Sequence, residues 1–536
     1  MASRPGCPGE GGGDGKEMRP AWMTPHIVRS TALVMVLFGT DKVLALVRDI
    51  AIGCAFGTSP ELDAYYAAFE LPDGLFTVLA GAAMSTTLIP VLTDYLQRND
   101  RDGAWQMVSS VINAVLLMVI GVSFLAALLA PQIIRMVAPG FGPDQVVLAA
   151  RLMRWVLIQT MVSSVSGIVM GVLQAHQHFL LPAAAPICYT LGRIAGALLL
   201  APRWGIFGLV WGGLAGTLAH LLIQVPGLIR FRARWWPVLI HPGLLRVGIL
   251  MVPRSLTLGI TYLNFVLPTY LGSRLAPGSI SAYEYAWRLM QFPETIFATA
   301  VAMVIFPTLA ERASRGDREG LWQAATGALR LILTLTIPAG VGMVLLGRPL
   351  TALILQRGAF GPASTEAVYW ALQFFGLGLV GHAMLEIATR LFYAQKDMWS
   401  PFWVTLITTT INGALGWVLL PWLAHGGIAL SNSVAACLGA GMLLSMARWR
   451  LGMRAGSGLP GTVTRVGLAS GVMAGGVLIF QRLLPDAGEF VAGVGGLAVG
   501  MVTYGLAALM IGNQEMREAL NLLRPPRRTQ AHRSGD

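Results

Sequence analysis

The chain has 536 residues, of which 55% are hydrophobic and only 12% are charged, and its formal net charge is +12. Soluble proteins carry about 25% charged residues, so this composition excludes an ordinary soluble domain and predicts an all-α polytopic membrane protein. The excess of Lys and Arg does not indicate nucleic-acid binding, because these residues gather in the connections on one side of the predicted spans.

Residues 1–24 are rich in Gly, Pro and charge and are predicted to be a disordered cytoplasmic tail. About fourteen stretches follow that have the roughly 20 apolar residues needed by a transmembrane helix. The basic connections place both termini in the cytoplasm. We expect an N-terminal lobe, a basic linker, a C-terminal lobe, an extra helix pair and a basic cytoplasmic tail, in the ranges 25–228, 229–246, 247–448, 449–512 and 513–536.

The two predicted lobes repeat one pattern. Phe141-Gly142-Pro143 matches Phe360-Gly361-Pro362, and Pro182 matches Pro401, each at an offset of 219 residues. Six spans fit within that offset, and because six is even, both copies cross the membrane in the same direction. The sequence therefore predicts two parallel six-helix repeats that form a V-shaped central cavity, plus two C-terminal helices. Rocking of the lobes opens such a cavity to each side in turn.

Four charged residues, Asp41, Lys42, Arg48 and Asp49, interrupt the first span. At about 100° per residue they fall within an arc of about 120°, so they form one polar stripe on an apolar helix. Charged groups at membrane depth usually face a wet cavity. The alternative is structural: Asp41 pairs with Arg48 and Lys42 with Asp49, and the pairs only lock this helix to a neighbour.

A second charged pair lies in the eighth span, where Glu284 and Arg288 are four residues apart and suited to an ion pair. Arg288 is also a candidate for binding a ligand anion, because a guanidinium group binds phosphate oxygens at two places. Glu70, in the second span, is expected to be the counter-ion of Arg288 when no ligand is bound. Asn412 and the threonines before it offer oxygen ligands for Na⁺, although polar residues between helices more often serve packing.

No catalytic or metal site is predicted. The sequence has no Walker A motif, no nucleophile elbow and no metal-ligand spacing, and its four cysteines are scattered. We therefore expect a transporter rather than an enzyme, without a cofactor. Its energy would come from an ion gradient, the membrane potential or the gradient of the cargo.

Several stretches are recognisable together: the run from Lys42 to Asp49, the run from Asp63 to Pro72, and the run from Tyr285 to Pro293, with Phe56-Gly57 and Ala138-Pro139-Gly140-Phe141. They resemble the MurJ/MviN lipid II flippases of the MOP exporter superfamily, over roughly residues 27–512. The resemblance implies a protein of the bacterial inner membrane. Its cargo would be lipid II, the undecaprenyl-diphosphate-linked peptidoglycan precursor, moved from the inner to the outer leaflet.

The resemblance also implies a site. A central cationic cavity takes the diphosphate and sugars, and the last two helices form a groove for the lipid tail. Arg48 and Arg288 match family arginines, Asp49 and Asp63 match acidic positions, and Lys42 stands where Arg is usual. The predicted cavity residues are Lys42, Arg48, Asp49, Asp63, Glu70, Glu284 and Arg288.

Two residues depart from the family pattern and make the expected cavity less cationic. Phe76 stands where Arg is typical, and Gly81 stands where an acidic residue is common. Three alternatives stay open: a flippase for another polyprenyl-linked glycan, a small-molecule exporter of the same superfamily, and a non-transporting scaffold for envelope assembly. The expected partners are the glycan lipid and the bilayer, with other cell-wall synthesis proteins allowed by the resemblance.

Overall fold

The structure is a computed structural model that describes residues 25–81, 87–451, 458–485, 488–513 and 515. Every regular element among these residues is a helix, so the all-α prediction is confirmed. The predicted tail at 1–24 and almost all of the predicted tail at 513–536 lie outside the described residues.

The chain forms two lobes and a C-terminal helix pair. The N-terminal lobe contains α1 (Pro25–Phe56), α2 (Pro60–Leu75), η1 (Phe76–Gly81), α4 (Leu88–Gln97), α5 (Arg101–Leu128), α6 (Ala130–Val137), α7 (Pro143–Ala175), α8 (Leu180–Ala195), η2 (Gly196–Leu200), α9 (Ala201–Trp204), α10 (Ile206–Leu222) and α11 (Val225–Arg230). The C-terminal lobe contains α12 (Pro242–Gly272), α13 (Ser279–Glu294), η3 (Thr295–Thr299), α14 (Ala300–Ser314), α15 (Arg318–Leu355), α16 (Pro362–Ala394), α17 (Trp399–Leu423) and α18 (His425–Leu451). The pair consists of α19 (Leu459–Leu483) and η4 (Val491–Gly495) continued by α20 (Gly496–Met510).

Eleven helical segments among the described residues are long and apolar enough to cross a membrane. The multi-pass prediction is therefore confirmed, whereas the number of about fourteen spans is not. The helices α1 and α12, with 32 and 31 residues, are also long enough, but they carry charged or polar side chains along their length. Both helices contact the other lobe, α1 through α15 and α12 through α2 and η1.

The internal repeat is visible in the helix boundaries. α7 and α16 each have 33 residues, and their first residues, Pro143 and Pro362, are 219 positions apart. The turns that follow them are also alike, because Gln177 and Lys396 both adopt a positive φ, of 58° and 61°. The predicted duplication therefore holds in the backbone as well as in the residues that the sequence comparison used.

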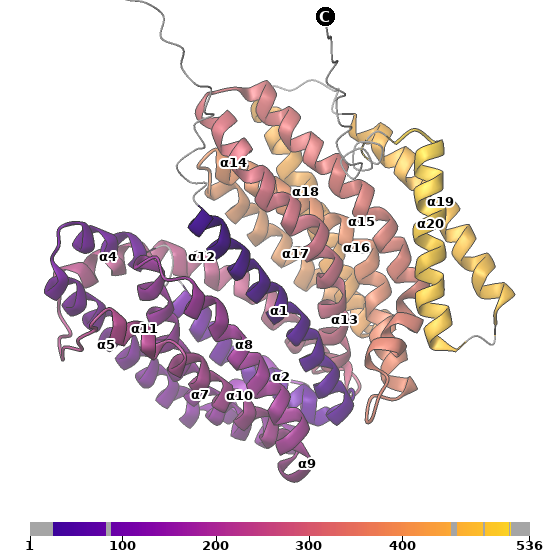
Figure 1. The fold of residues 1–536 in the computed structure, drawn as a ribbon. Coiled ribbons are helices and arrows are strands. Elements are labelled where there is room, and N and C mark those ends of the chain that lie inside the picture. The colour runs from indigo at the N-terminus through magenta and orange to yellow at the C-terminus, as the bar shows by residue number, and fades with distance from the viewer. Residues whose placement is uncertain (1–24, 82–86, 452–457, 486–487, 514, 516–536) are drawn as a thin grey trace, which may run out of the picture.

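The two lobes meet at the end near the start of α13 and separate toward the end that carries α4 and α14, which gives the predicted V shape (Figure 1). α1 packs mainly on α8, and α12 contacts both lobes. The pair α19 and α20 lies beside α15, on the side of the C-terminal lobe away from the N-terminal lobe (Figure 1).

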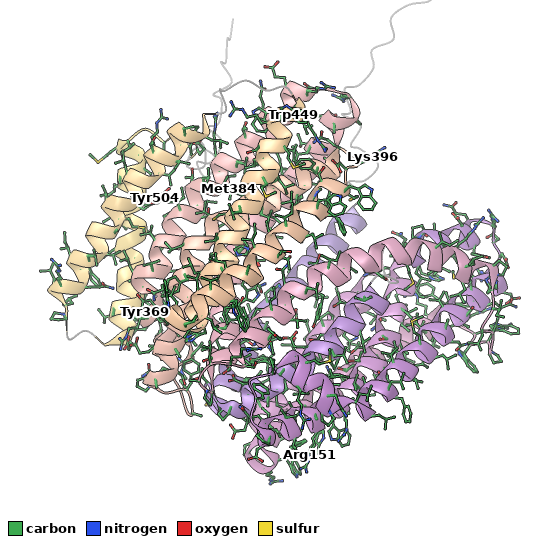
Figure 2. All side chains as sticks on the ribbon, turned by 180° about the vertical axis from the view of Figure 1, so that it is seen from behind. Arg151, Tyr369, Met384, Lys396, Trp449 and Tyr504 are labelled. Atoms are coloured by element: carbon green, nitrogen blue, oxygen red, sulfur yellow. The ribbon has the colours of Figure 1, made fainter. Side chains whose placement is uncertain are left out.

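Apolar side chains cover the outward faces of the helices (Figure 2). Phe124, Val304, Trp422 and Met510 each expose more than half of their surface. Lys396 lies at one end of the molecule (Figure 2). A surface of this kind is stable against lipid, so the charged residues at membrane depth have only the space between the lobes to face.

Candidate functional site

Two adjoining cavities lie between the lobes. The larger has a volume of about 630 Å³ and is lined from α2, α7, α8, α10, α12 and α13. The smaller has a volume of about 290 Å³ and is lined mainly from α1, α13 and η3. Arg288 lines both cavities. The predicted polar stripe of α1 therefore faces a cavity and not a dry helix interface.

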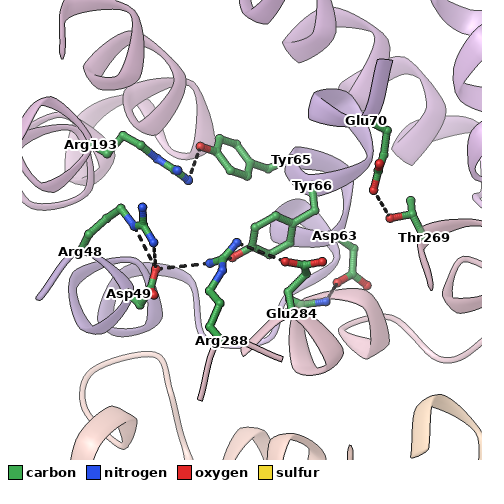
Figure 3. Close-up of polar contacts among 11 residues, drawn as sticks. Arg48, Asp49, Asp63, Tyr65, Tyr66, Glu70, Arg193, Thr269, Glu284 and Arg288 are labelled. Carbon is green, nitrogen blue, oxygen red and sulfur yellow. Dashed lines mark hydrogen bonds and ion pairs between the residues drawn. The ribbon is translucent and has the colours of Figure 1, made fainter. Parts of the chain in front are cut away.

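The carboxylate of Asp49 is shared by two arginines from different lobes (Figure 3). Its Oδ1 lies 2.9 Å from the Arg48 guanidinium and 3.3 Å from the Arg288 guanidinium. The alternative pairing along α1 is wrong, because Arg48 turns to its neighbour and Asp41 instead accepts a hydrogen bond of 3.0 Å from the Thr190 hydroxyl. One carboxylate thus orients two guanidinium groups without neutralising both.

Arg288 has two further partners on the cavity wall. It forms the predicted ion pair with Glu284, at 3.2 Å, and it donates a hydrogen bond of 3.0 Å to the hydroxyl of Tyr66. Its guanidinium carbon also lies 5.0 Å from the centre of the Tyr66 ring. These contacts hold the planar fork in one orientation, which is the condition for recognising an anion with two oxygens.

Lys42 is exposed and lines the smaller cavity near Arg48. Within the described part of the chain it forms no ion pair. Its flexible ammonium group adds positive charge to the wall of the smaller cavity without fixed geometry.

Asp63 has a different role from the predicted one. Its carboxylate accepts hydrogen bonds from the backbone N–H of Gly278, at 2.6 Å, and of Ser281, at 2.7 Å. It is buried and lines neither cavity. Its predicted position in the cavity is therefore corrected: α13 begins after a glycine that has no side chain for capping, and Asp63 of the opposite lobe caps its N-terminus.

Glu70 lines the larger cavity, as predicted, but it is not the counter-ion of Arg288. Its carboxylate accepts a hydrogen bond of 2.5 Å from the hydroxyl of Thr269 on α12, and its backbone carbonyl accepts one from Tyr262. That prediction was wrong because Asp49 and Glu284 lie closer to Arg288. Glu70 instead joins α2 to α12 across the lobes.

Arg193 is the main residue of the site that is not among the predicted cavity residues, because the sequence left it open between a structural and a functional role. It lies on α8, lines the larger cavity and donates a hydrogen bond of 2.8 Å to the hydroxyl of Tyr65 (Figure 3). An arginine in the middle of an apolar span was the available signal, but its face was unknown without the helix packing. Phe76 lines the same cavity, so this departure from the family pattern lies in the wall that includes Arg193.

The candidate Na⁺ ligands Asn412 and Thr409 are hydrogen-bonded to side chains of neighbouring helices in this structure. Asn412 accepts a hydrogen bond of 2.8 Å from Ser431, and Asn264 donates one of 2.6 Å to Thr409. Among the described residues no group of His, Cys, Asp and Glu has a metal-binding arrangement. These contacts fit the packing interpretation of the polar residues on α17.

Hydrogen bonds join the two lobes at the end where they meet. We call residues 54–59, 138–142, 273–281 and 356–364 the junction. The Ala359 N–H of the C-terminal lobe donates to the carbonyl of Cys54 in the N-terminal lobe at 2.8 Å. The Gly140 N–H of the N-terminal lobe donates to the hydroxyl of Ser273 in the C-terminal lobe at 3.2 Å. Gly140 and Ala359 are also 219 positions apart, so the two N–H donors occupy equivalent positions in the internal repeat.

Comparison with known proteins identifies the family. A profile described as Lipid II flippase MurJ matches residues 52–492, which is most of the chain. The chain belongs to the MurJ family. It is 29% identical over 410 residues to the lipid II flippase MurJ of Burkholderia cenocepacia, covering 74% of this chain and 79% of that relative. It is 28% identical over 501 residues to a probable lipid II flippase MurJ of Rhizobium tropici, covering 89% of this chain and 92% of the relative.

The MurJ fold is also found by comparison with solved structures. The inward closed conformation of a lipid II flippase MurJ superposes with a TM-score of 0.78 at 23% identity, covering 92% of this chain and all of that one. An inward-facing multidrug resistance transporter of the MATE family, within the MOP superfamily, superposes with a TM-score of 0.64 at 14% identity, covering 78% of this chain and 98% of that one. These two likenesses confirm the predicted fold.

Proposed function

We propose that this protein is a lipid II flippase of the bacterial inner membrane, which moves its cargo from the inner to the outer leaflet by alternating access. The observation that carries the proposal is the position of Arg288, which lines both cavities between the lobes and is paired with carboxylates from both. Membership of the MurJ family supports lipid II as the cargo.

The local charge suits a diphosphate. Lys42, Arg48 and Arg288 line the smaller cavity, where the carboxylates come from Asp41 and Asp49. Three cationic groups against two carboxylates leave a net positive charge in this cavity. An incoming diphosphate exchanges its oxygens for those of the shared carboxylate, and a preorganised site loses little entropy in this exchange.

The junction supplies the closed gate of one state. The basic connections at 230–246 and 312–318 lie at the opposite end from the junction, which supports a cytoplasmic position for the open side and for both termini. Opening the junction while the other end closes exposes the headgroup outside. An inside-negative membrane potential favours this step, because each charge that crosses the full field contributes about 2.3 kcal/mol per 100 mV.

The test uses Arg288→Ala in a strain that has been depleted of its own flippase. We expect loss of complementation at normal protein level, because the variant leaves Asp49 and Glu284 in the cavity without their shared cation. Arg315→Ala is the matched control, because Arg315 is exposed and pairs only with its helix neighbour Glu311 among the described residues. Full growth of the Arg288→Ala strain would contradict a role for Arg288 in cargo binding.

A vesicle assay with the purified protein distinguishes the alternatives. Lipid II should be transported, and another polyprenyl-diphosphate glycan should compete weakly. Transport of the second lipid alone would assign a different cargo, and transport of small cations with neither lipid would indicate an exporter of the multidrug type. For a non-transporting scaffold, cysteines placed at Lys42, Arg48 and Arg288 would be inaccessible to water-soluble thiol reagents.

A further inference from the structure

We propose that Arg193 forms a second anion-binding subsite, which recognises an acidic group of the cargo headgroup beyond its diphosphate. This inference rests on the proposed function and deepens it. Arg48 lines the smaller cavity and Arg193 lines the larger one, whereas Arg288 lines both. A headgroup with its diphosphate between Arg48 and Arg288 therefore extends its sugars and peptide toward Arg193.

Arg193 has hydrogen-bonding capacity left over. The side chain is buried, with 9% of the residue exposed, and one terminal nitrogen donates to Tyr65. Its Nε is buried without a hydrogen-bond partner, and within the described residues no carboxylate lies within ion-pair distance of it. Buried polar groups are nearly always satisfied, so an unsatisfied guanidinium nitrogen at a cavity wall indicates a missing ligand.

Gln159, on α7, also has a buried polar atom without a hydrogen-bond partner. The amide of Gln159 on α7 donates to the hydroxyl of Tyr189 at 3.3 Å, while its Oε1 is buried without a partner. Gly213 on α10 makes room for both side chains, because a Cβ there would lie 3.0 Å from Gln159 Oε1 and 3.7 Å from Arg193 Cγ. Arg193 and Gln159 thus both line the larger cavity, and each has a buried polar atom without a hydrogen-bond partner among the described residues.

The surroundings favour a sugar–peptide group with one acid. The rings of Tyr65, Phe69 and Tyr189 lie 5.7 to 5.9 Å from the Arg193 guanidinium carbon, and the partly exposed rings of Phe69 and Tyr189 can contact a sugar. The larger cavity also contains the carboxylates of Glu70, Asp73 and Glu284, which repel acids placed elsewhere in it. Arg288 is already engaged by two carboxylates, so Arg193 is the favourable position for an additional carboxylate of the cargo.

The test compares the affinity of the full chain for two probes, purified lipid II and undecaprenyl diphosphate, which lacks the sugars and the peptide. Arg193→Gln should weaken lipid II binding by at least about tenfold, as expected for a lost charge-assisted hydrogen bond, and leave undecaprenyl diphosphate binding unchanged. Arg193→Lys should restore part of the affinity. Arg288→Gln should weaken both probes, and Arg203→Gln, at an exposed arginine on α9, should weaken neither.

The ratio of the two affinities keeps the test valid even if Arg193→Gln lowers the folded fraction, because misfolding affects both probes equally. Gln159→Leu serves as the second variant and should also lose lipid II selectively. An unchanged ratio for both variants overturns the subsite. If the wild-type protein binds neither probe, the proposed function itself fails, whereas wild-type binding of lipid II with no effect of Arg193→Gln overturns this inference alone.

Discussion

The two lobes have the same backbone pattern but contribute different chemistry to the space between them. Tyr65 and Phe69 on α2 stand at the repeat positions of Glu284 and Arg288 on α13, 219 residues later. One lobe therefore supplies aromatic faces where the other supplies an ion pair, and both sets line the larger cavity. The two lobes thus share the positions of their helices, but equivalent positions on α2 and α13 carry different chemistry.

The same divergence separates α8 from α17. Arg193 corresponds to Asn412, but Asn412 is hydrogen-bonded to Ser431 and lies against Asn264, whereas Arg193 keeps a nitrogen without a partner. The polar groups of α17 hold helices together, and the arginine of α8 borders an open cavity. A polar residue in a membrane span thus serves packing in one repeat and binding in the other, depending on whether its neighbours satisfy it.

The capping of α2 and α13 gives the comparison its strongest test. Ser59 caps α2 with its own hydroxyl, but the equivalent residue before α13 is Gly278, so Asp63 caps α13 from the other lobe. Asp63→Ala should lower the stability of the closed junction by about 3 kcal/mol, because two buried N–H groups lose a charged acceptor. Thermal unfolding of the purified protein measures the change.

Ser59→Ala is the matched variant and should cost about 1 kcal/mol, since it removes a local cap that solvent or backbone can partly replace. If both variants lowered the melting temperature equally, the cap from the opposite lobe would stabilise the protein no more than the local cap from Ser59. Cysteine cross-linking across the junction should also fall in Asp63→Ala and stay unchanged in Ser59→Ala.

A smaller effect is expected where α8 meets α10. Gly212 lies directly against α8, and a Cβ there would lie 2.4 Å from the Cα of Gly196. The equivalent residue of the C-terminal lobe is Ser431, so α17 and α18 accommodate a side chain at this position. Gly212→Ala should destabilise the protein by about 1–3 kcal/mol through overpacking, measured as a lower melting temperature in detergent.

Gly441→Ala on α18 serves as the control, because a Cβ at Gly441 would meet no atom within 4 Å. It should leave the melting temperature unchanged or raise it slightly, since alanine is the better helix former. A normal melting temperature for Gly212→Ala would mean that α8 and α10 accommodate a side chain at this position as readily as α17 and α18 do.

The smallest effect concerns the connections that precede α8 and α17, where His178 and Asp397 are equivalent. Burial, and then the charge of Arg230, lowers the pKa of His178. Burial opposes the shift at Asp397, but hydrogen bonds from Ser400 and the ion pair with Arg450 lower its pKa overall. One connection thus places like charges together when His178 is protonated, and the other pairs opposite charges.

Both shifts make the folded state bind fewer protons than the unfolded state, so stability should fall as the pH falls. The His178 contribution is lost below its ordinary pKa of 6.5, and the Asp397 contribution is lost as the pH drops below 3.8 toward the lowered folded value. Melting curves of Asp397→Asn should lie slightly below those of the wild type at pH 7. An offset that did not shrink as the pH fell below 3.8 would contradict the assignment to the ionised carboxylate.

Much of the site was predictable because some contacts are local in sequence. The Glu284–Arg288 pair follows from a spacing of four residues on a helix, and the exposure of Lys42 and Arg48 to a cavity follows from a polar stripe that lipid rejects. The pairing of Asp49 with Arg288 of the other lobe was not predictable, since the two residues are 239 positions apart in the sequence. Nothing in the periodicity of α1 or α13 states which helix lies opposite.

The sequence by itself determined the class of the protein, because hydropathy, charge distribution and an offset of 219 residues fix a duplicated, multi-pass helical chain and a family resemblance. Only the tertiary structure decided which charged groups are satisfied and which face the cavity. One physical reason explains both why Asp63 caps a helix and why Arg193 lines the cavity. The energy of a buried polar group depends on partners brought by other helices, and those partners are set by packing in three dimensions.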